Sequence, residues 1–408
     1  MGSNITLPKF EQVVVEDGLK DGYWIDAVDI NGDGKPDLIV SGLAIGEVAW
    51  YENPGWQKRI IGQFQKPVAL DHADLTGNGR PDFIICHDYG ECMFHCRDGD
   101  GKISWLQNPG DPSGDGHWAT HPIAPLMATH RLRLGHFTRT DRLELMALPV
   151  VGPQGGLTGV HAPVRVMLYP VPEQPAQPEG WEGTLVDEVS FRIIHDVQVG
   201  KFRPGSDLDS VILSSEEGVT WFYYDGAAWQ KRHIGTGETE EVGLTGFLGT
   251  GNAATGRIGD DPQAYVATME PFHGNVVAVY VKEPGSTLES GPWKRHVLDV
   301  FGDPNEVGEG AGHHVVCADF DGDGDDEFLV ALRGPRPWQG VFYYKCVDLE
   351  KALFVKQRVS WSSAARITVA DFDGDGRPDF ATTGYYTPGY FLAENPQVLV
   401  FLNRTGDA

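Results

Sequence analysis

Four acidic loops share one spacing of residues that could hold a metal ion. Each follows the pattern D-x-[DN]-x-D-G-x-x-D or a close variant, which places side-chain oxygens at positions one, three, five and nine of a tight turn. Such oxygen cages bind hard divalent cations, and Ca²⁺ tolerates an irregular cage better than Mg²⁺. Asp, Asn and Gly are also good turn formers, but clustered carboxylates without a cation repel one another, so we expect several structural Ca²⁺ sites. The expected ligands are Asp29, Asn31, Asp33, Asp37, Asp74, Thr76, Asn78, Asp82, Asp319, Asp321, Asp323, Glu327, Asp371, Asp373, Asp375 and Asp379.

The acidic loops account for half of a large excess of negative charge. The chain has 58 Asp and Glu against 32 Lys and Arg, a formal net charge of −26, and 13 acidic residues stand in the loops. Nucleic-acid binding needs clustered cations and a positive field, so we expect no nucleic-acid partner. The longest apolar runs are far shorter than the roughly 20 residues that cross a bilayer, so we expect no membrane partner.

The acidic loops also mark an internal repeat. An apolar alternating run precedes each loop and another follows it, and three degenerate copies keep this pattern without the ligands. A third apolar run with an aromatic residue follows most copies, as in 48–51 and 219–223, and a fourth run often comes next. Seven copies of four strands predict an all-β fold, a seven-bladed β-propeller of four-stranded antiparallel blades. The blades of this single domain, residues 1–408, are expected near 23–62, 68–125, 130–194, 195–235, 241–299, 313–359 and 365–404.

The N-terminal segment is expected to close the ring. The last repeat, 365–404, has no fourth strand of its own, whereas residues 9–15 resemble a fourth strand without a blade. Pairing the two segments removes the exposed strand edge that an open ring would leave.

Histidines gather on one face of this expected ring. In a propeller the first strand of each blade lines the central channel, and the loops that lead into it share a rim with the loops between the second and third strands. Eight of the 14 histidines fall on this rim, opposite the acidic loops. Because His titrates near neutral pH, the cluster indicates a polar-ligand site with acid–base capacity. These residues are His87, His95, His130, His161, His195, His273, His313 and His314.

Some rim residues could hold a catalytic metal at the central channel. Imidazole nitrogens and carboxylate oxygens suit Zn²⁺ or another divalent ion, although the sequence contains no H-E-x-x-H or C-x2-C signature. It also lacks a G-x-S-x-G elbow, a P-loop and a G-x-G-x-x-G after a strand, which excludes hydrolase-triad, NTPase and dinucleotide-enzyme interpretations. The candidate metal ligands are His195, Glu240, His313 and His314, with Asp196 and Glu241 beside them.

The cysteines and the first residues bear on the cellular compartment. Five cysteines, an odd number, do not form a disulfide framework, and Cys92 and Cys96 are interpreted as ordinary thiols. The start of the sequence has no basic region followed by an apolar one. We therefore expect a cytoplasmic protein, or a secreted protein whose signal has been removed.

Two resemblances connect these patterns to known families. The acidic loops resemble the FG-GAP/VCBS repeats of integrin-like propellers. The segment 22–43, from Gly22-Tyr-Trp-Ile-Asp to Ser-Gly-Leu43, and the following Trp50-Tyr-Glu-Asn-Pro-Gly-Trp56 resemble the propeller of fungal aldos-2-ulose dehydratases and anhydrofructose dehydratases. This resemblance implies β-elimination of water from a keto-sugar, assisted by a divalent metal and with a histidine as base.

The resemblance to the dehydratases suggests roles for individual rim residues. Elimination needs a base, an electrophile for the enediolate and an acid for the leaving oxygen. We expect His130 to be the base, Arg131 or Arg333 with a rim-bound metal to be the electrophile, and His87 or Tyr386 to be the acid. The expected substrate-binding residues are Trp24, His273, Trp338, Tyr385 and Arg366.

Two alternatives stay open. The same architecture is similar to that of rhamnose-glucuronate lyases, which act on arabinogalactan ends by elimination beside a uronate carboxylate. A non-catalytic propeller that binds a sugar or a protein is the second alternative. In the enzymatic interpretations the partner is a small sugar or an oligosaccharide, and the sequence leaves the oligomeric state open.

Overall fold

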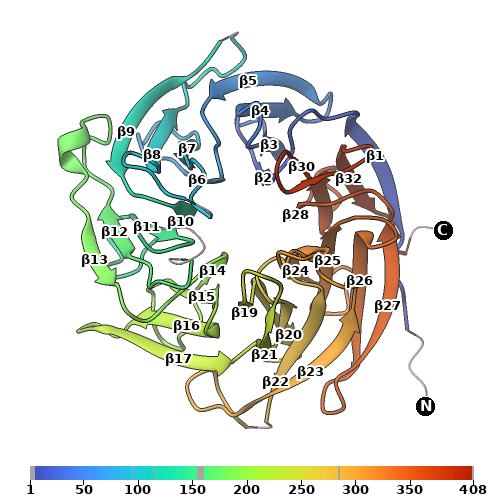
Figure 1. Cartoon of the computed structure of the whole chain (residues 1–408). Coiled ribbons are helices and arrows are strands. Elements are labelled where there is room, and N and C mark those ends of the chain that lie inside the picture. Colours follow the sequence, from blue (N-terminus) through green and yellow to red (C-terminus); the bar gives the residue numbers. More distant parts are fainter. Residues whose placement is uncertain (1–4, 94, 115, 154–159, 284, 407–408) are drawn as a thin grey trace.

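The computed structural model describes residues 5–93, 95–114, 116–153, 160–283 and 285–406. Seven four-stranded antiparallel sheets surround a central axis (Figure 1). Blade 1 contains β2 (Trp24–Val28), β3 (Asp37–Ser41), β4 (Glu47–Glu52) and β5 (Gln57–Gln63); blade 2 contains β6 (Ala69–Ala73), β7 (Asp82–His87), β8 (Lys102–Gln107) and β9 (Ala119–Pro125); blade 3 contains β10 (Thr129–Gly135), β11 (Glu144–Pro149), β12 (Val166–Pro170) and β13 (Thr184–Asp187).

The remaining blades follow the same order. Blade 4 contains β14 (Asp196–Gly200), β15 (Ser210–Ser215), β16 (Gly218–Tyr224) and β17 (Trp229–Gly235); blade 5 contains β20 (Asn252–Ile258), β21 (Asp261–Glu270), β22 (Val276–Lys282) and β23 (Trp293–Val300); blade 6 contains β24 (Gly312–Ala318), β25 (Glu327–Arg333), β26 (Gln339–Asp348) and β27 (Leu353–Ser360); blade 7 contains β28 (Arg366–Ala370), β29 (Asp379–Thr383), β32 (Val398–Asn403) and β1 (Phe10–Glu16). Outside the blades lie the hairpins β18 (Glu238–Val242) with β19 (Phe247–Gly249) and β30 (Tyr386–Thr387) with β31 (Phe391–Leu392), and the 3₁₀ helix η1 (Pro178–Gly180). The predicted fold class is confirmed.

The apolar runs of the sequence form the middle of each blade. Every residue of β3, β7 and β25 is buried, because neighbouring blades pack on both faces of these strands. The third strands bring the large aromatics into the same layer, where Trp50, Trp105 and Trp221 have no exposed surface. The fourth strands consist mainly of exposed and half-buried residues, as expected for strands at the outer edge of each blade.

The ring is closed by the first strand of the chain. β1 pairs antiparallel with β32, and the order of the last sheet is β1-β32-β29-β28. Phe10 packs its ring 5.0 Å from Phe380 and 6.1 Å from Phe320, which places β1 against both blade 6 and blade 7. The expected pairing of residues 9–15 with the last blade is confirmed.

Blade 5 departs from the expected position. Its inner strand is β20, which begins at Asn252, whereas the start that we expected near residue 241 lies in the hairpin β18–β19. Leu244 is 80% exposed, and the chain reverses at Gly243 and Gly246, which have φ values of +67° and +68°. The inner strand has the sequence Asn-Ala-Ala-Thr-Gly-Arg-Ile. Its residues are mostly polar or small, so the sequence does not show the run of large apolar residues that is typical of a core strand.

A prediction follows from the closure of the ring. Phe10→Ala should lower the free energy of unfolding by about 2 kcal/mol. This loss is smaller than that of a Phe→Ala substitution at a fully buried position, because the Phe10 side chain is only half-buried. Chemical denaturation followed by circular dichroism measures the change. Val14→Ala, at a position 49% exposed on the same strand, should stay within about 0.5 kcal/mol of wild type. Equal effects of the two substitutions would contradict the closing role of β1.

Candidate active site

The inner strands carry the rim residues to the mouth of the central channel. Because each blade is antiparallel, the loops into the first strand and the loops between the second and third strands lie on one rim. The acidic loops join the first and second strands and therefore lie on the opposite rim.

Three histidines from three consecutive blades meet at this mouth. His195 directly precedes β14, His273 lies in the loop between β21 and β22, and His313 lies on β24. Their ligand nitrogens all lie within 4.8 Å of one another. The three side chains are buried, with at most 4% of each residue exposed. We call this group the histidine triad.

Each ring of the triad is fixed through one nitrogen only. The Nδ1 atoms face carbonyl or carboxylate oxygens, whereas none of the three Nε2 atoms has a hydrogen-bond partner in the described part of the chain. An Nδ1–H that donates to such an oxygen leaves the lone pair on Nε2, the arrangement typical of metal-ligating histidines. The acceptors are Gly251 O, 2.7 Å from His195 Nδ1; Glu309 Oε2, 2.7 Å from His273 Nδ1; and Ala365 O, next to His313 Nδ1.

Electrostatics keep these rings uncharged. Burial lowers the pKa of His273 to about 4 and holds the pKa values of His195 and His313 well below their usual range. A neutral imidazole is the form that binds a metal. Three neutral imidazole nitrogens are one of the protein ligand sets found in catalytic Zn²⁺ sites.

The triad differs from the metal set expected from the sequence. His195 and His313 are in it, but His314 is not, because its Nε2 faces Arg366 Nη2 at 2.8 Å and its Nδ1 accepts from the backbone of Ile367. Glu240 is exposed in the hairpin β18–β19 and lies outside the group. His273, expected to bind substrate, supplies the third nitrogen instead.

His130 and two tyrosines border the triad. The His130 ring centroid lies 5.2 Å from that of His195, and its Nε2 lies 3.1 Å from Tyr23 Oη. The rings of Tyr23 and Tyr385 lie 5.4 and 5.2 Å from His313. Burial, followed by the charge of Arg131, holds the pKa of His130 well below its usual range, so that the ring is neutral at neutral pH.

Glu309 was not found by the sequence reasoning, although it orients a triad member. Its carboxylate accepts from His273 and pairs with Arg333, which also donates to Gly310 O and stacks 4.9 Å from the Tyr385 ring. Burial alone would raise the pKa of Glu309, but His273 and Arg333 lower it to about 2. Arg333 is therefore paired and positions the site through Glu309.

A layer of charged residues lies beside the triad in the channel. Arg131 and Arg366 approach the same oxygen of Asp196, at 3.6 and 3.4 Å, and both stack on the Trp24 ring, at 5.3 and 4.0 Å. Burial lowers the pKa of Arg366 to about 9. Trp24 and Arg366, expected to bind substrate, thus belong to this layer together with Arg131.

Three expected site residues lie apart from the triad. His87 contacts Ser104 Oγ at 2.9 Å and the Asp88 carboxylate at 3.2 Å. Trp338 is 38% exposed and packs near Phe301. Tyr386 begins the hairpin strand β30 and bonds through its backbone to Gly22.

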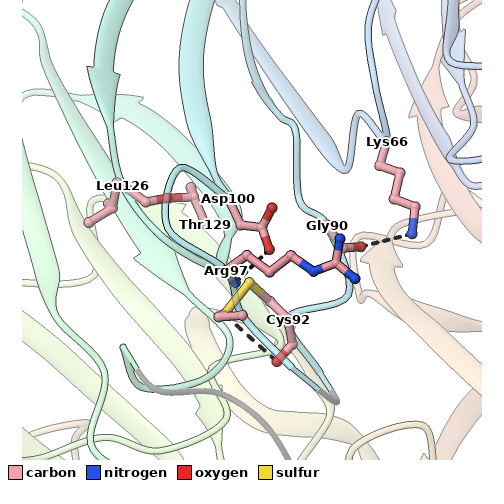
Figure 2. Close-up of a disulfide and its surroundings, with 8 residues drawn as sticks. Lys66, Gly90, Cys92, Arg97, Asp100, Leu126 and Thr129 are labelled. Carbon is pink, nitrogen blue, oxygen red and sulfur yellow. Dashed lines mark hydrogen bonds between the residues drawn. A yellow bond between two sulfur atoms is a disulfide. The ribbon is translucent and has the colours of Figure 1, made fainter.

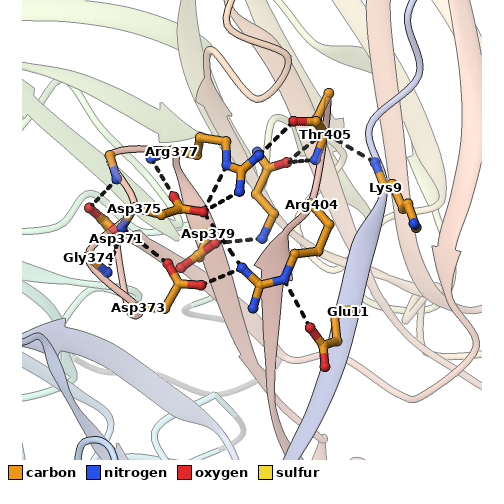
Figure 3. A network of polar contacts seen from close by, with 12 residues as sticks. Lys9, Glu11, Asp371, Asp373, Gly374, Asp375, Arg377, Asp379, Arg404 and Thr405 are labelled. Carbon is orange, nitrogen blue, oxygen red and sulfur yellow. Dashed lines mark hydrogen bonds and ion pairs between the residues drawn. The ribbon is translucent and has the colours of Figure 1, made fainter. Parts of the chain in front are cut away.

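The acidic loops hold themselves together by hydrogen bonds and ion pairs. In each loop the first aspartate accepts backbone N–H groups of the turn, as Asp371 does from Gly374 and Gly376 (Figure 3). In the Asp371 loop, Arg404 pairs with Asp373 and with Glu11 on β1, which links the loop to the closing strand. The Asp319 and Asp371 loops each bring three carboxylates within 4.8 Å, and calcium binding stays a prediction.

The Asp319 loop already contains a cation of its own. Lys345 Nζ lies 2.7 Å from Asp321, 2.7 Å from Asp323 and 2.9 Å from Glu327. The ammonium therefore offsets the repulsion that we expected a metal to offset.

The expectation of ordinary thiols is wrong for one pair of cysteines. Cys92 and Cys96 form a disulfide, shown in Figure 2, whereas Cys86, Cys317 and Cys346 are free. The chain folds back between Glu91 and His95, which brings the two Cα atoms to 4.2 Å. Among the described residues, no helix is long and apolar enough to cross a membrane.

Comparisons with known proteins agree with this architecture. Residues 100–283 match the family "Aldos-2-ulose dehydratase, beta-propeller domain", and residues 29–85 match an FG-GAP-like repeat. Aldos-2-ulose dehydratase of Phanerodontia chrysosporium is 38% identical over 426 residues that cover 97% of this chain. The chain is a relative of the aldos-2-ulose dehydratase propeller. It spans 46% of the length of aldos-2-ulose dehydratase, about half of that protein.

Solved structures show the same fold outside the aldos-2-ulose dehydratase family. BBS1N in complex with ARL6DN matches 97% of this chain and 97% of its own, with a TM-score of 0.55 and 12% identity. An ancestral GH74 enzyme matches 98% of this chain and 48% of its own, with the same TM-score and identity. At such identities the likeness shows the fold alone.

The lysine in the Asp319 loop leads to a prediction about calcium. Lys345→Met should lower stability in EGTA by about 3 kcal/mol, because three carboxylates lose their shared partner, and added Ca²⁺ should restore much of the loss. Thermal unfolding with and without Ca²⁺ measures both effects. Lys356→Met, which removes a pair with Asp299 away from the loop, is the control. An identical calcium-dependent shift in the two variants would contradict a cation site in this loop.

Proposed function

We propose that this chain is a carbohydrate lyase that removes water from a keto-sugar by β-elimination, with Zn²⁺ held by His195, His273 and His313. The three bare Nε2 atoms of the triad carry this proposal. The relationship to aldos-2-ulose dehydratase supports the class of reaction, because that name describes loss of water from a keto-sugar.

The triad residues fit a bound Zn²⁺ in number, protonation and orientation. When bound, Zn²⁺ supplies a Lewis acid for a carbonyl oxygen. The acceptors Gly251, Glu309 and Ala365 hold the three rings through Nδ1, and the ligand nitrogens lie within 4.8 Å of one another. The three side chains are buried, and electrostatic interactions are stronger in buried surroundings than in water.

His130 is the proposed base. Its Nδ1 has no partner among the described residues, and its ring is neutral. It takes the proton from the carbon next to the ketone and returns it to the leaving hydroxyl, so that one water leaves for each double bond formed. Tyr23 Oη can accept a hydrogen bond from His130 Nε2 or donate one to it. The contact can therefore persist in both protonation states of His130.

The arginines have supporting roles in this proposal. Arg333 and Glu309 hold His273, and Arg131 holds the backbone oxygen of His130 at 2.9 Å. His87 and Tyr386, which we expected to protonate the leaving group, lie apart from the triad, so the proposal assigns that step to His130.

The first test concerns the base. His130→Gln should lower turnover of a 1,5-anhydrofructose or aldos-2-ulose substrate by about 10²- to 10⁴-fold, with unchanged circular dichroism and metal content. Ultraviolet absorbance of the unsaturated product measures the rate. His233→Gln, on the exposed fourth strand β17, is the matched control. Turnover of His130→Gln near the wild-type value would remove His130 from the mechanism.

The second test concerns the metal. Wild-type protein should contain close to one Zn²⁺ per chain after gel filtration, and His195→Ala or His273→Ala should lose it, since two nitrogens no longer define the site. Elemental analysis measures zinc directly, apart from any calcium in the acidic loops. Unchanged zinc in both variants would refute the triad as its site.

The same assay separates the alternative functions. Product from a rhamnosyl-glucuronide but not from keto-sugars would favour the uronate lyase. No product from either class with zinc bound would favour a binding module.

A further inference from the structure

A cavity of the described chain lies on the same rim as the triad. It has a volume of about 680 Å³ and is bounded by segments 43–45, 63–66, 89–91 and 387–390. These are the end of β5, loops of blades 1 and 2, and the β30–β31 hairpin that lies between β29 and β32 of blade 7. Sites for small organic ligands have volumes of about 300–1,000 Å³. None of its lining residues belongs to the proposed catalytic group.

The lining combines ring faces with amides and charges. Phe64, Tyr89 and Tyr390 supply aromatic surface and Ile45, 46% exposed, supplies aliphatic surface. Gln63 and Gln65 add amides, and Lys66 pairs with Glu91 at the edge. Sugar rings have apolar C–H faces and a hydroxyl perimeter, so this combination matches a neutral saccharide better than a purely apolar ligand or an ion.

One residue that lines this cavity has a buried polar atom without a partner among the described residues. Tyr89 is only 4% exposed, and its Oη has no hydrogen bond within the part of the chain that the structure describes. A buried hydroxyl without a partner costs free energy, and a ligand hydroxyl would satisfy it. Burial raises the pKa of Tyr89 well above its usual value, so it remains a neutral donor.

The cavity lies close to residues of the proposed active site. The Tyr89 ring lies 6.0 Å from that of His130. Gly389 and Tyr390 line both this cavity and a smaller one that is also lined by Glu309, the partner of His273. A ligand in the large cavity would therefore lie next to a sugar held at the triad.

We infer that this cavity is a subsite for a second sugar residue, so that the enzyme accepts a saccharide of two or more rings whose reactive keto-sugar enters the triad. The inference rests on the proposed function, because it names the substrate class of that site. Phe64 and Ile45 form the apolar platform for the second ring, and Tyr89 Oη bonds one of its hydroxyls.

The test uses saccharides that do not react. Maltotriose and cellotriose are titrated separately into the intact protein, and binding is followed by saturation-transfer NMR and calorimetry. At least one should bind, and Phe64→Ala and Ile45→Arg should each weaken it by about tenfold, as expected for the loss of one ring contact. Ile45 is exposed, so its variant keeps the test valid if Phe64→Ala fails to fold.

The structure offers a matched control. Phe64 directly follows the fourth strand of blade 1, and Trp361 directly follows the fourth strand of blade 6, where it is 68% exposed. Trp361→Ala should leave binding unchanged. Failure of both trisaccharides to bind wild-type protein at millimolar concentration, or equal affinity in all variants, would overturn the subsite. Binding of only the apolar dye 8-anilinonaphthalene-1-sulfonate would overturn it too.

The two proposals can fail separately. Trisaccharide binding that depends on Phe64, without any dehydration of keto-sugars, would refute the proposed function and leave a saccharide site. Dehydration of a monosaccharide without trisaccharide binding would refute only the subsite.

Discussion

The site depends on hydrogen bonds that pass from each blade to the segment leading into the next. His195, just before blade 4, bonds to Gly251, which precedes blade 5. In the same way, His273 of blade 5 bonds to Glu309, which precedes blade 6. His313 of blade 6 bonds to Ala365, which precedes blade 7. Each bond fixes one imidazole ring and leaves its other nitrogen bare. The spacing of the blades therefore sets the geometry of the triad.

Ring closure completes the last blade. β1 fills the last sheet, and Arg404 links the neighbouring acidic loop to Glu11 on that strand. The buried aromatics of the third strands fill the space between blades, where a change in packing is felt throughout close-packed neighbours. The rim that carries the triad holds three neutral nitrogens close together, although they have no hydrogen-bond partner among the described residues.

The two rims divide the charge of the molecule. On one rim, the acidic loops are stabilised by hydrogen bonds from the backbone of their own turns. Ion pairs with Lys345 and with arginines stabilise them further. On the other rim, Arg333 and Glu309 form a buried pair next to His273, and Arg131 and Arg366 share Asp196. These groups are three arginines and two carboxylates, so one excess positive charge lies beside the neutral histidines.

The sequence by itself determined the ring, because the repeat records local strand and turn propensities that need no tertiary information. Its spacing predicted the ring of blades, apart from the start of blade 5, and also the closure by residues 9–15 and the rim that gathers the histidines. The tertiary structure decided which histidines meet. A register shift between Gly312 and His314 sends the neighbouring histidines into different surroundings, and the loop of His273 reaches the triad from another blade. The disulfide of Cys92 and Cys96 and the lysine in the Asp319 loop also depend on how the chain folds back. At a bulge or in a loop, the direction of a side chain is set by packing in three dimensions. The periodic pattern of apolar residues in a sequence does not contain this information.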